Sequence, residues 1–147
     1  MLSVENNRII FRIEFRPDRL SIDSMKILAI IARILLGLVF VVFGSNAFIH
    51  FMPMPEMTGY PGQFIGSMAA TGYLQAVAAF QVAGGLLLLI GRFVPLGLTL
   101  LGPVIVNIVM YHAFMDHNGM PIALVVSVLE AFLIWQHRAA FASVLHA

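Results

Sequence analysis

Four long apolar runs dominate this sequence, at residues 27–48, 70–90, 93–114 and 121–135. Each is close to the ~20 residues that cross the hydrocarbon core of a bilayer, and the short fourth run is expected to continue into Gln136 and His137. Because backbone N–H and C=O groups in hydrocarbon must be paired within the protein, the runs are expected to be α-helices. The chain is 61% hydrophobic and 10% charged, far from a soluble composition. The sequence therefore predicts an all-α, integral membrane four-helix bundle.

The composition also excludes several classes of function. The chain contains no cysteine, which excludes disulfides, thiol redox chemistry, thiolate-held zinc and iron–sulfur clusters. Its net charge of +1 leaves no basic face to neutralise phosphates, so a nucleic-acid partner is not expected. The expected surroundings are a lipid bilayer, and any electron transfer would need a bound cofactor or a quinone.

The basic residues indicate the orientation in the membrane. The segments at 50–68 and 115–120 contain no Lys or Arg. The other connecting segments carry Arg8, Arg12, Arg16, Arg19, Lys26, Arg92 and Arg138. Because basic residues favour the cytoplasmic side of short loops, both termini are predicted to be cytoplasmic, in a multi-pass protein of the cytoplasmic (inner) membrane. The predicted parts are a cytoplasmic tail at 1–25, a transmembrane domain at 26–138 and a short cytoplasmic tail at 139–147.

The first 24 residues differ in kind from the rest of the chain. Phe11, Ile13 and Phe15 alternate with charged residues, a period of two that predicts a short strand or a segment lying on the membrane surface. The alternatives are a disordered tail and an over-extended start that precedes a natural Met25. A signal peptide is disfavoured, because the first apolar run is too long and Arg33 interrupts it.

The first loop on the predicted outer side is long. Pro53, Pro55 and Pro61 deny regular structure to its beginning. Residues 63–70 then mix apolar and small side chains, as a re-entrant or interfacial half-helix does. We expect this segment to fold over the outer mouth of the bundle.

Two opposite charges, Arg33 and Glu130, lie inside the apolar runs. By their positions in the predicted helices, each lies ~10 Å from the cytoplasmic end. An unpaired charge near a helix centre costs roughly 2.5–3.5 kcal/mol, so the favoured interpretation is that the two side chains pair with each other. Gly37 and Gly44 share the face of Arg33 and leave it smooth for close approach of another helix.

Two alternatives to this pair stay open. Arg33 could extend its long side chain to the inner head groups, while a protonated Glu130 is hydrogen-bonded by Ser127 or His137, which share its helical face. The two charged residues could also form a site for a ligand or a proton.

Amide side chains occupy two further positions inside the runs. Gln81 lies near the middle of the second run, and Asn107 lies in the outer half of the third. Each is interpreted first as a hydrogen bond between helices, worth ~0.6–2 kcal/mol. Pro103 is expected to bend the third helix one turn before Asn107 and to open space beside it.

A second group of polar residues gathers at the predicted outer ends of the helices. Its members, with Glu56 in the loop nearby, are Asn46, His50, His112, Asp116 and His117. Hydrogen bonding at the membrane interface is the main interpretation, and no metal site is predicted because no tight ligand motif is present. The alternatives are Cu(I) held by Met52, Met54 and Met57, and haem held by His50 and His112.

Three stretches resemble the DoxX family of small four-helix membrane proteins. They are residues 33–40 with Gly44, residues 81–89 with Gly91, and residues 92–96 followed by 103–107. The likeness covers about residues 26–138. The first-span arginine of the family corresponds to Arg33, whereas Gln81 stands where members often carry Glu. The resemblance implies an up-down four-helix bundle in the cytoplasmic membrane.

The resemblance also implies a link to quinone-dependent oxidoreduction, because the family takes its name from a subunit of thiosulfate:quinone oxidoreductase. Most members have no known activity, and the residues do not decide whether this chain is an enzyme. We expect a small subunit or accessory of such an enzyme, beside a partner redox subunit or in a homo-oligomer. Arg33, Gln81, Asn107 and Glu130 would form its internal polar site, with a quinone as the candidate ligand. The alternative is a non-enzymatic structural partner or a carrier of a small apolar molecule.

Overall fold

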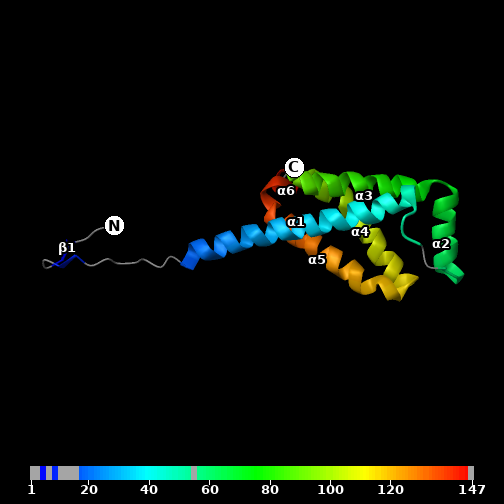
Figure 1. Cartoon of the computed structure of the whole chain (residues 1–147), viewed down its shortest axis with the longest axis horizontal. Coiled ribbons are helices and arrows are strands. Elements are labelled where there is room, and N and C mark those ends of the chain that lie inside the picture. Colours follow the sequence, from blue (N-terminus) through cyan, green and yellow to red (C-terminus); the bar gives the residue numbers. More distant parts are fainter. Residues whose placement is uncertain (1–3, 6–7, 10–16, 54–55, 146–147) are drawn as a thin grey trace.

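Four long helices form the body of the protein (Figure 1): α1 (Pro17–Ile49), α3 (Tyr73–Ile90), α4 (Val94–Phe114) and α5 (Met120–Gln136). The shorter elements are α2 (Gly59–Ala70), α6 (Arg138–Leu145), the 3-10 helix η1 (His117–Gly119), and the antiparallel strands β1 (Val4–Glu5) and β2 (Arg8–Ile9). The computed structural model describes residues 4–5, 8–9, 17–53 and 56–145, and side chains between residues 23 and 142. The alternating segment at 11–16 and Met54 lie outside the described residues.

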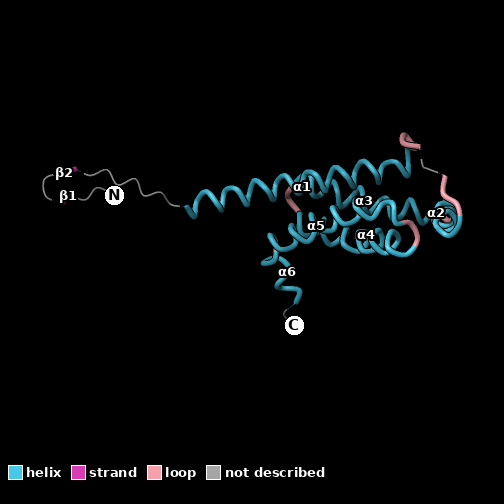
Figure 2. Tube along the Cα trace, turned by 90° about the horizontal axis from the view of Figure 1, so that it is seen from below, coloured by secondary structure: helices cyan, strands magenta, loops and turns pink. Residues whose placement is uncertain are grey.

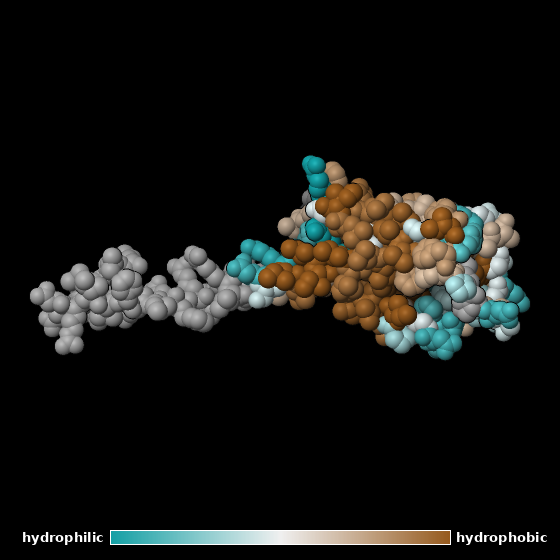
Figure 3. All heavy atoms as spheres, in the orientation of Figure 1, coloured by the Kyte–Doolittle hydropathy of each residue, from teal (hydrophilic) through white to brown (hydrophobic). Residues whose placement is uncertain are grey.

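The four predicted spans are confirmed. The helices that are long and apolar enough to cross a membrane cover Asp23–Ile49, Tyr73–Ile90, Val94–Phe114 and His117–Gln136. Large apolar side chains remain exposed along them, and Figure 3 shows an apolar surface over the body with hydrophilic residues towards its ends. Such an apolar surface has its natural solvent in a lipid bilayer, because a soluble monomer rarely exposes more than a few hundred Å² of contiguous apolar surface. The protein is therefore a multi-pass membrane protein.

The helices pack in a closed ring: α1 against α3, α3 against α4, α4 against α5, and α5 against α1. Leucines from these four helices, fully buried, fill the centre: Leu36, Leu88, Leu98, Leu101 and Leu133. We call the end of the ring that carries Lys26, Arg92 and Arg138 the basic end, and the opposite end the α2 end.

Glycines set two of the helix crossings. Gly37 of α1 faces Gly85 of α3, and a Cβ built on Gly37 would lie 2.9 Å from the Gly85 carbonyl oxygen. Gly84 of α3 faces Gly97 of α4 in the same way, with a Cβ on Gly97 3.0 Å from the Gly84 carbonyl oxygen. Small residues let membrane helices approach closely, so α3 is held between α1 and α4 by the glycines on its two faces.

Helix α2 lies across one end of the bundle (Figure 1), which confirms a short helix over one mouth of the bundle, although the helix begins at Gly59 and includes Pro61, whereas it was predicted for residues 63–70. Its Phe64 ring stands 5.8 Å from the ring of Tyr111 in α4. After α2 the chain turns at Gly72, whose positive φ of 76° suits glycine, and α3 therefore begins at Tyr73 rather than at residue 70.

Both predicted tails contain helix. Helix α1 begins at Pro17 and projects beyond the bundle in Figure 1, so it reaches into the segment predicted as a tail. Proline is favoured in the first turn of a helix, where its missing N–H has no partner in any case. Beyond α5, the chain turns at His137 and continues as α6, which points away from the bundle in Figure 2.

Candidate functional site

The two charges inside the spans do not pair. The Arg33 guanidinium lies directly over Gly91 at the basic end, where α3 ends. The ion pairs that the described residues form are Lys26 with Asp23 and His112 with Asp116. The favoured prediction, a bond between Arg33 and Glu130, is therefore wrong.

The packing of the glycine face explains this correction. Gly37 and Gly44 share the face of Arg33, and that face meets α3 rather than α5, because Gly44 contacts Gln81 and Gly37 contacts Gly85. Arg33 is directed along α3 to its carboxyl end, where the partial negative charge of the helix dipole favours a cation. Its Nε is buried and has no hydrogen-bond partner among the described residues.

Glu130 is buried in the wall between α4 and α5. It is 5% exposed, and its Oε1 has no hydrogen-bond partner in the described part of the chain. The expected donors are engaged elsewhere, because Ser127 Oγ donates to the Ala123 carbonyl at 2.7 Å and His137 Nδ1 lies 2.9 Å from the Leu133 carbonyl. The alternative in which Ser127 or His137 bonds Glu130 is therefore not formed in the described part of this structure.

Space beside Glu130 forms a groove, which we call the α4–α5 groove. Its volume is about 300 Å³, and its lining is apolar apart from Glu130 and Ser127: Ile105, Val106, Val109, Met110, Ala131 and Ile134. On α4, Gly102 faces the carboxyl, and a Cβ built there would lie 3.5 Å from Glu130 Oε1. The carboxyl is thus enclosed by protein on one side and borders a lateral groove on the other.

Gln81 and Asn107 are brought together under α2. Both line a small cavity of about 140 Å³ with Tyr111, His112 and the apolar side chains of α2. No hydrogen bond joins the two amides in the described structure, so the predicted contacts between helices are not formed there. Of the four residues predicted as one internal site, these two share a cavity, whereas Arg33 and Glu130 lie apart from them.

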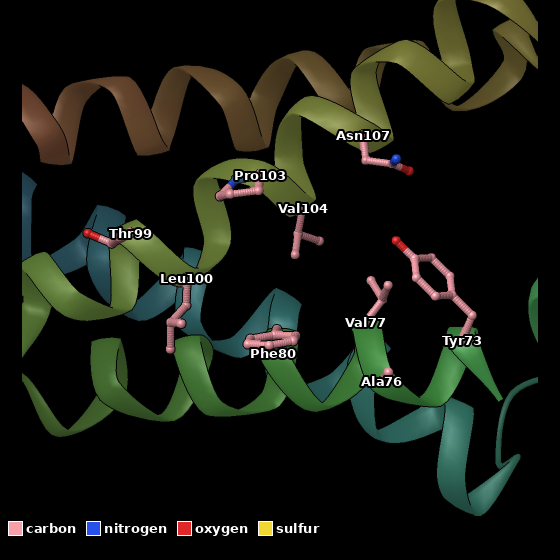
Figure 4. A pocket seen from close by; sticks show the side chains of 9 residues that line it. All are labelled: Tyr73, Ala76, Val77, Phe80, Thr99, Leu100, Pro103, Val104 and Asn107. Carbon is pink, nitrogen blue, oxygen red and sulfur yellow. The ribbon is translucent and has the colours of Figure 1, made fainter.

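A larger groove, which we call the α3–α4 groove, runs along the bend of α4 (Figure 4). It has a volume of about 310 Å³ and is lined by Tyr73, Ala76, Val77, Phe80, Thr99, Leu100, Pro103, Val104 and Asn107. The α4 ribbon changes direction beside Pro103, as predicted, because proline cannot donate a hydrogen bond to the carbonyl one turn earlier. At one end of the groove the Tyr73 hydroxyl and the Asn107 amide point toward each other.

Sequence reasoning missed two aromatic residues that line the α3–α4 groove. Tyr73 begins α3 and Phe80 lies two turns further, so both fall on the face turned to Asn107. Their spacing of seven residues was the available signal, because such residues share a helical face. Gln75 was also missed, and its Oε1 is buried without a partner among the described residues.

The polar group at the α2 end is held by local hydrogen bonds. Asn46 closes the end of α1 by bonding Met52 twice, with Nδ2 donating to the carbonyl at 3.2 Å and Oδ1 accepting from the N–H at 2.7 Å. His112 Nδ1 lies 2.7 Å from the Asp116 carbonyl, and Asp116 Oδ1 accepts from Asn118. These contacts agree with the main interpretation of hydrogen bonding.

The described residues do not bring the candidate copper and haem ligands together. Met57 is engaged by the Tyr111 hydroxyl, at 3.4 Å from its sulfur. His50 and His117 are exposed. Within the described residues, no group of three or more His, Cys, Asp or Glu side chains is placed to hold a metal ion.

Comparison with family models, with curated proteins and with solved structures gave no match for this chain. The resemblance to the DoxX family therefore stays a hypothesis. The structure itself defines the class: a small, all-helical, multi-pass membrane protein whose four candidate spans form one bundle.

Proposed function

We propose that this protein is a membrane-embedded binding subunit that holds a lipophilic ring carrying carbonyl groups, a quinone, in the α3–α4 groove. In this proposal it is a DoxX-like subunit or accessory of a quinone-linked oxidoreductase in the cytoplasmic membrane. The observation that carries it is that the Asn107 side chain, inside a membrane span, lacks a hydrogen-bond partner among the described residues. This side chain is exposed and opens into the groove.

An amide in that position is costly without a partner. Placing a polar group in an apolar environment without a compensating hydrogen bond costs roughly 2–7 kcal/mol, depending on the reference state. Lipid tails offer no such bond, so the partner must come from a bound molecule or another protein. The Asn107 Nδ2 is a donor, and a ring carbonyl is an acceptor that suits it.

The rest of the groove supports a ring of this kind. Phe80 supplies an aromatic wall, and Pro103 and Val104 supply an apolar one opposite. The Tyr73 hydroxyl lies at the same end as Asn107, so a carbonyl placed there would accept from two donors. Thr99 adds no free donor, because its hydroxyl donates to the Pro95 carbonyl at 2.8 Å.

The proposed role is binding and orientation. The residues around the groove hold the ring, and oxidation or reduction of the quinone is assigned to a partner redox subunit. Arg33 and Glu130, which the sequence predicts in the same internal site, lie outside this groove and have no contact role in it. A structural partner protein, which is one of the two alternatives beside a carrier of a small apolar molecule, would show no saturable quinone binding.

The test is the binding of decylubiquinone to the purified full chain in phosphatidylcholine nanodiscs. Asn107→Leu keeps the branched shape and the number of side-chain heavy atoms and removes the donor, and we expect the affinity to fall about tenfold, as the loss of one hydrogen bond of about 1.4 kcal/mol predicts. Thr99→Val is the matched control in the same groove and should bind as the unchanged protein does. Equal affinity for Asn107→Leu and the unchanged protein would refute the proposal.

A further inference from the structure

The α4–α5 groove contains a buried acid that the quinone proposal does not use. Glu130 is 5% exposed, its Oε1 has no partner among the described residues, and the carboxyl lines a groove whose wall residues Val106 and Met110 are exposed on the membrane face. Acidic residues in membrane spans are rare and mark ligand or ion sites when no internal partner exists. The groove is therefore a candidate site in its own right.

The groove presents acceptors and no cation. Neither α4 nor α5 contains a Lys or Arg, and the Arg33 guanidinium lies over Gly91 at the end of α3. Ser127, the other polar residue of the lining, has its hydroxyl proton engaged by the Ala123 carbonyl. What remains for a ligand is the carboxylate of Glu130 and the lone pairs of Ser127 Oγ.

We propose that the α4–α5 groove binds a lipophilic cation, an amphiphile whose ammonium group pairs with the Glu130 carboxylate while its alkyl chain lies against the apolar lining. An ammonium group supplies both the charge and the N–H donors that the carboxylate lacks. The volume of about 300 Å³ and the apolar wall suit an alkyl chain, which enters from the bilayer. This site is separate from the quinone site, so either proposal stands or falls without the other.

The experiment measures calorimetric binding of n-decylammonium to the full chain in nanodiscs of zwitterionic phosphatidylcholine, with empty nanodiscs as reference. The unchanged protein should bind it saturably at one site per chain. Glu130→Gln keeps the shape and removes the charge, and we expect affinity to fall at least about tenfold. Glu56→Gln, which removes the same charge from an exposed loop residue, is the matched control and should leave affinity unchanged. Neutral 1-decanol should bind more weakly than the cation.

A second variant guards against the failure of Glu130→Gln to fold. Ala131 is an exposed residue of the groove lining, so Ala131→Phe fills the groove from the lipid side and leaves the carboxyl in place. It should also weaken decylammonium binding at least about tenfold. Three outcomes would overturn the proposal. The first is undiminished decylammonium binding to Glu130→Gln or, if that variant does not fold, to Ala131→Phe, and the second is 1-decanol binding as tightly as the cation. The third is a Glu130-dependent change in oligomeric mass without saturable amine binding, which would assign the groove to a second copy of the chain.

Discussion

The two grooves beside α4 are similar in size and differ in chemistry. The α3–α4 groove measures about 310 Å³ and the α4–α5 groove about 300 Å³, and both are walled mainly by apolar side chains. The first offers neutral groups, the Asn107 amide and the Tyr73 hydroxyl, whereas the second offers one carboxyl, Glu130. An amide and a hydroxyl suit a neutral carbonyl, and a carboxylate suits a cation.

This difference shows that only a few atoms of a membrane groove determine which ligand it binds. Apolar walls interact with any lipophilic molecule, because lipid tails are as apolar as the walls themselves. Selectivity must then come from the few polar atoms, each of which is costly when left without a partner. One helix, α4, contributes a wall to both grooves, and its neighbours α3 and α5 supply Tyr73 and Glu130.

The largest effect is expected from exchanging the two charges inside the spans, Arg33 and Glu130. Arg33→Glu and Glu130→Arg should each destabilise the bundle by several kcal/mol, in line with roughly 2.5–3.5 kcal/mol for a misplaced charge in a span. The double exchange should lower the free energy of unfolding by about the sum of the two single losses, because residues that are not in contact act independently. Unfolding of the purified variants by SDS in mixed micelles measures their free energies of unfolding.

The exposed pair Asp23 and Lys26, 3.6 Å apart, provides the control exchange. Asp23→Lys with Lys26→Asp should change the free energy of unfolding by less than about 1 kcal/mol, as exposed pairs do. Rescue of the exchange inside the spans by the double variant would show that Arg33 and Glu130 pair after all, and Glu130 would no longer be free to define the α4–α5 groove.

A change at the crossing of α3 and α4 should separate the grooves. In Gly84→Ala the new methyl group would lie 2.7 Å from Leu101 Cγ and 3.1 Å from the Gly97 carbonyl oxygen, so the two helices must move apart. Overpacking of this kind costs about 1–3 kcal/mol. Decylubiquinone binding should weaken severalfold, while decylammonium binding stays the same, because the α4–α5 contact is untouched.

Gly66→Ala is the matched control, since a Cβ at Gly66 of α2 meets nothing within 4 Å. It should change neither the free energy of unfolding nor the affinity for decylubiquinone or decylammonium. Equal weakening of both ligands by Gly84→Ala would mean that the two grooves deform together and do not act as separate sites.

The smallest effect is expected at Tyr73. Tyr73→Phe removes one donor from the α3–α4 groove and should weaken decylubiquinone binding by about 2–10-fold, which corresponds to a net hydrogen bond of about 0.5–1.5 kcal/mol. Tyr60→Phe, which removes the hydroxyl of an exposed tyrosine in α2, should have no effect. The same binding measurement checks both variants. No difference between them would remove Tyr73 from the site and leave Asn107 as its sole donor.

Parts of the candidate site follow from the sequence alone. Asn107 and Pro103 were predicted to lie together beside a bend, because an interior proline and an amide one turn later act within a single helix. The position of Glu130 in the sequence identifies it as an expensive residue, because any charge inside an apolar run is expensive. The partnership of Tyr73 with Asn107 was not predicted, since it depends on how two helices face each other.

The predicted pairing of Arg33 with Glu130 was wrong because it, too, depends on how two helices face each other. Counting residues along two helices predicts depth, and the depths of Arg33 and Glu130 were derived in this way. The direction of a side chain around the bundle depends on which neighbour its helix face meets. Gly37 packs on Gly85, which turns the Arg33 face to α3.

The apolar runs were sufficient to establish four spans and an all-α bundle, because helix formation in hydrocarbon is a local requirement that each segment satisfies within itself. Tertiary structure alone decided which faces meet, that Arg33 ends over Gly91, and that Glu130 borders a groove without a partner. The physical reason is that periodicity places a residue on a face of its own helix, whereas close packing between helices determines what that face touches.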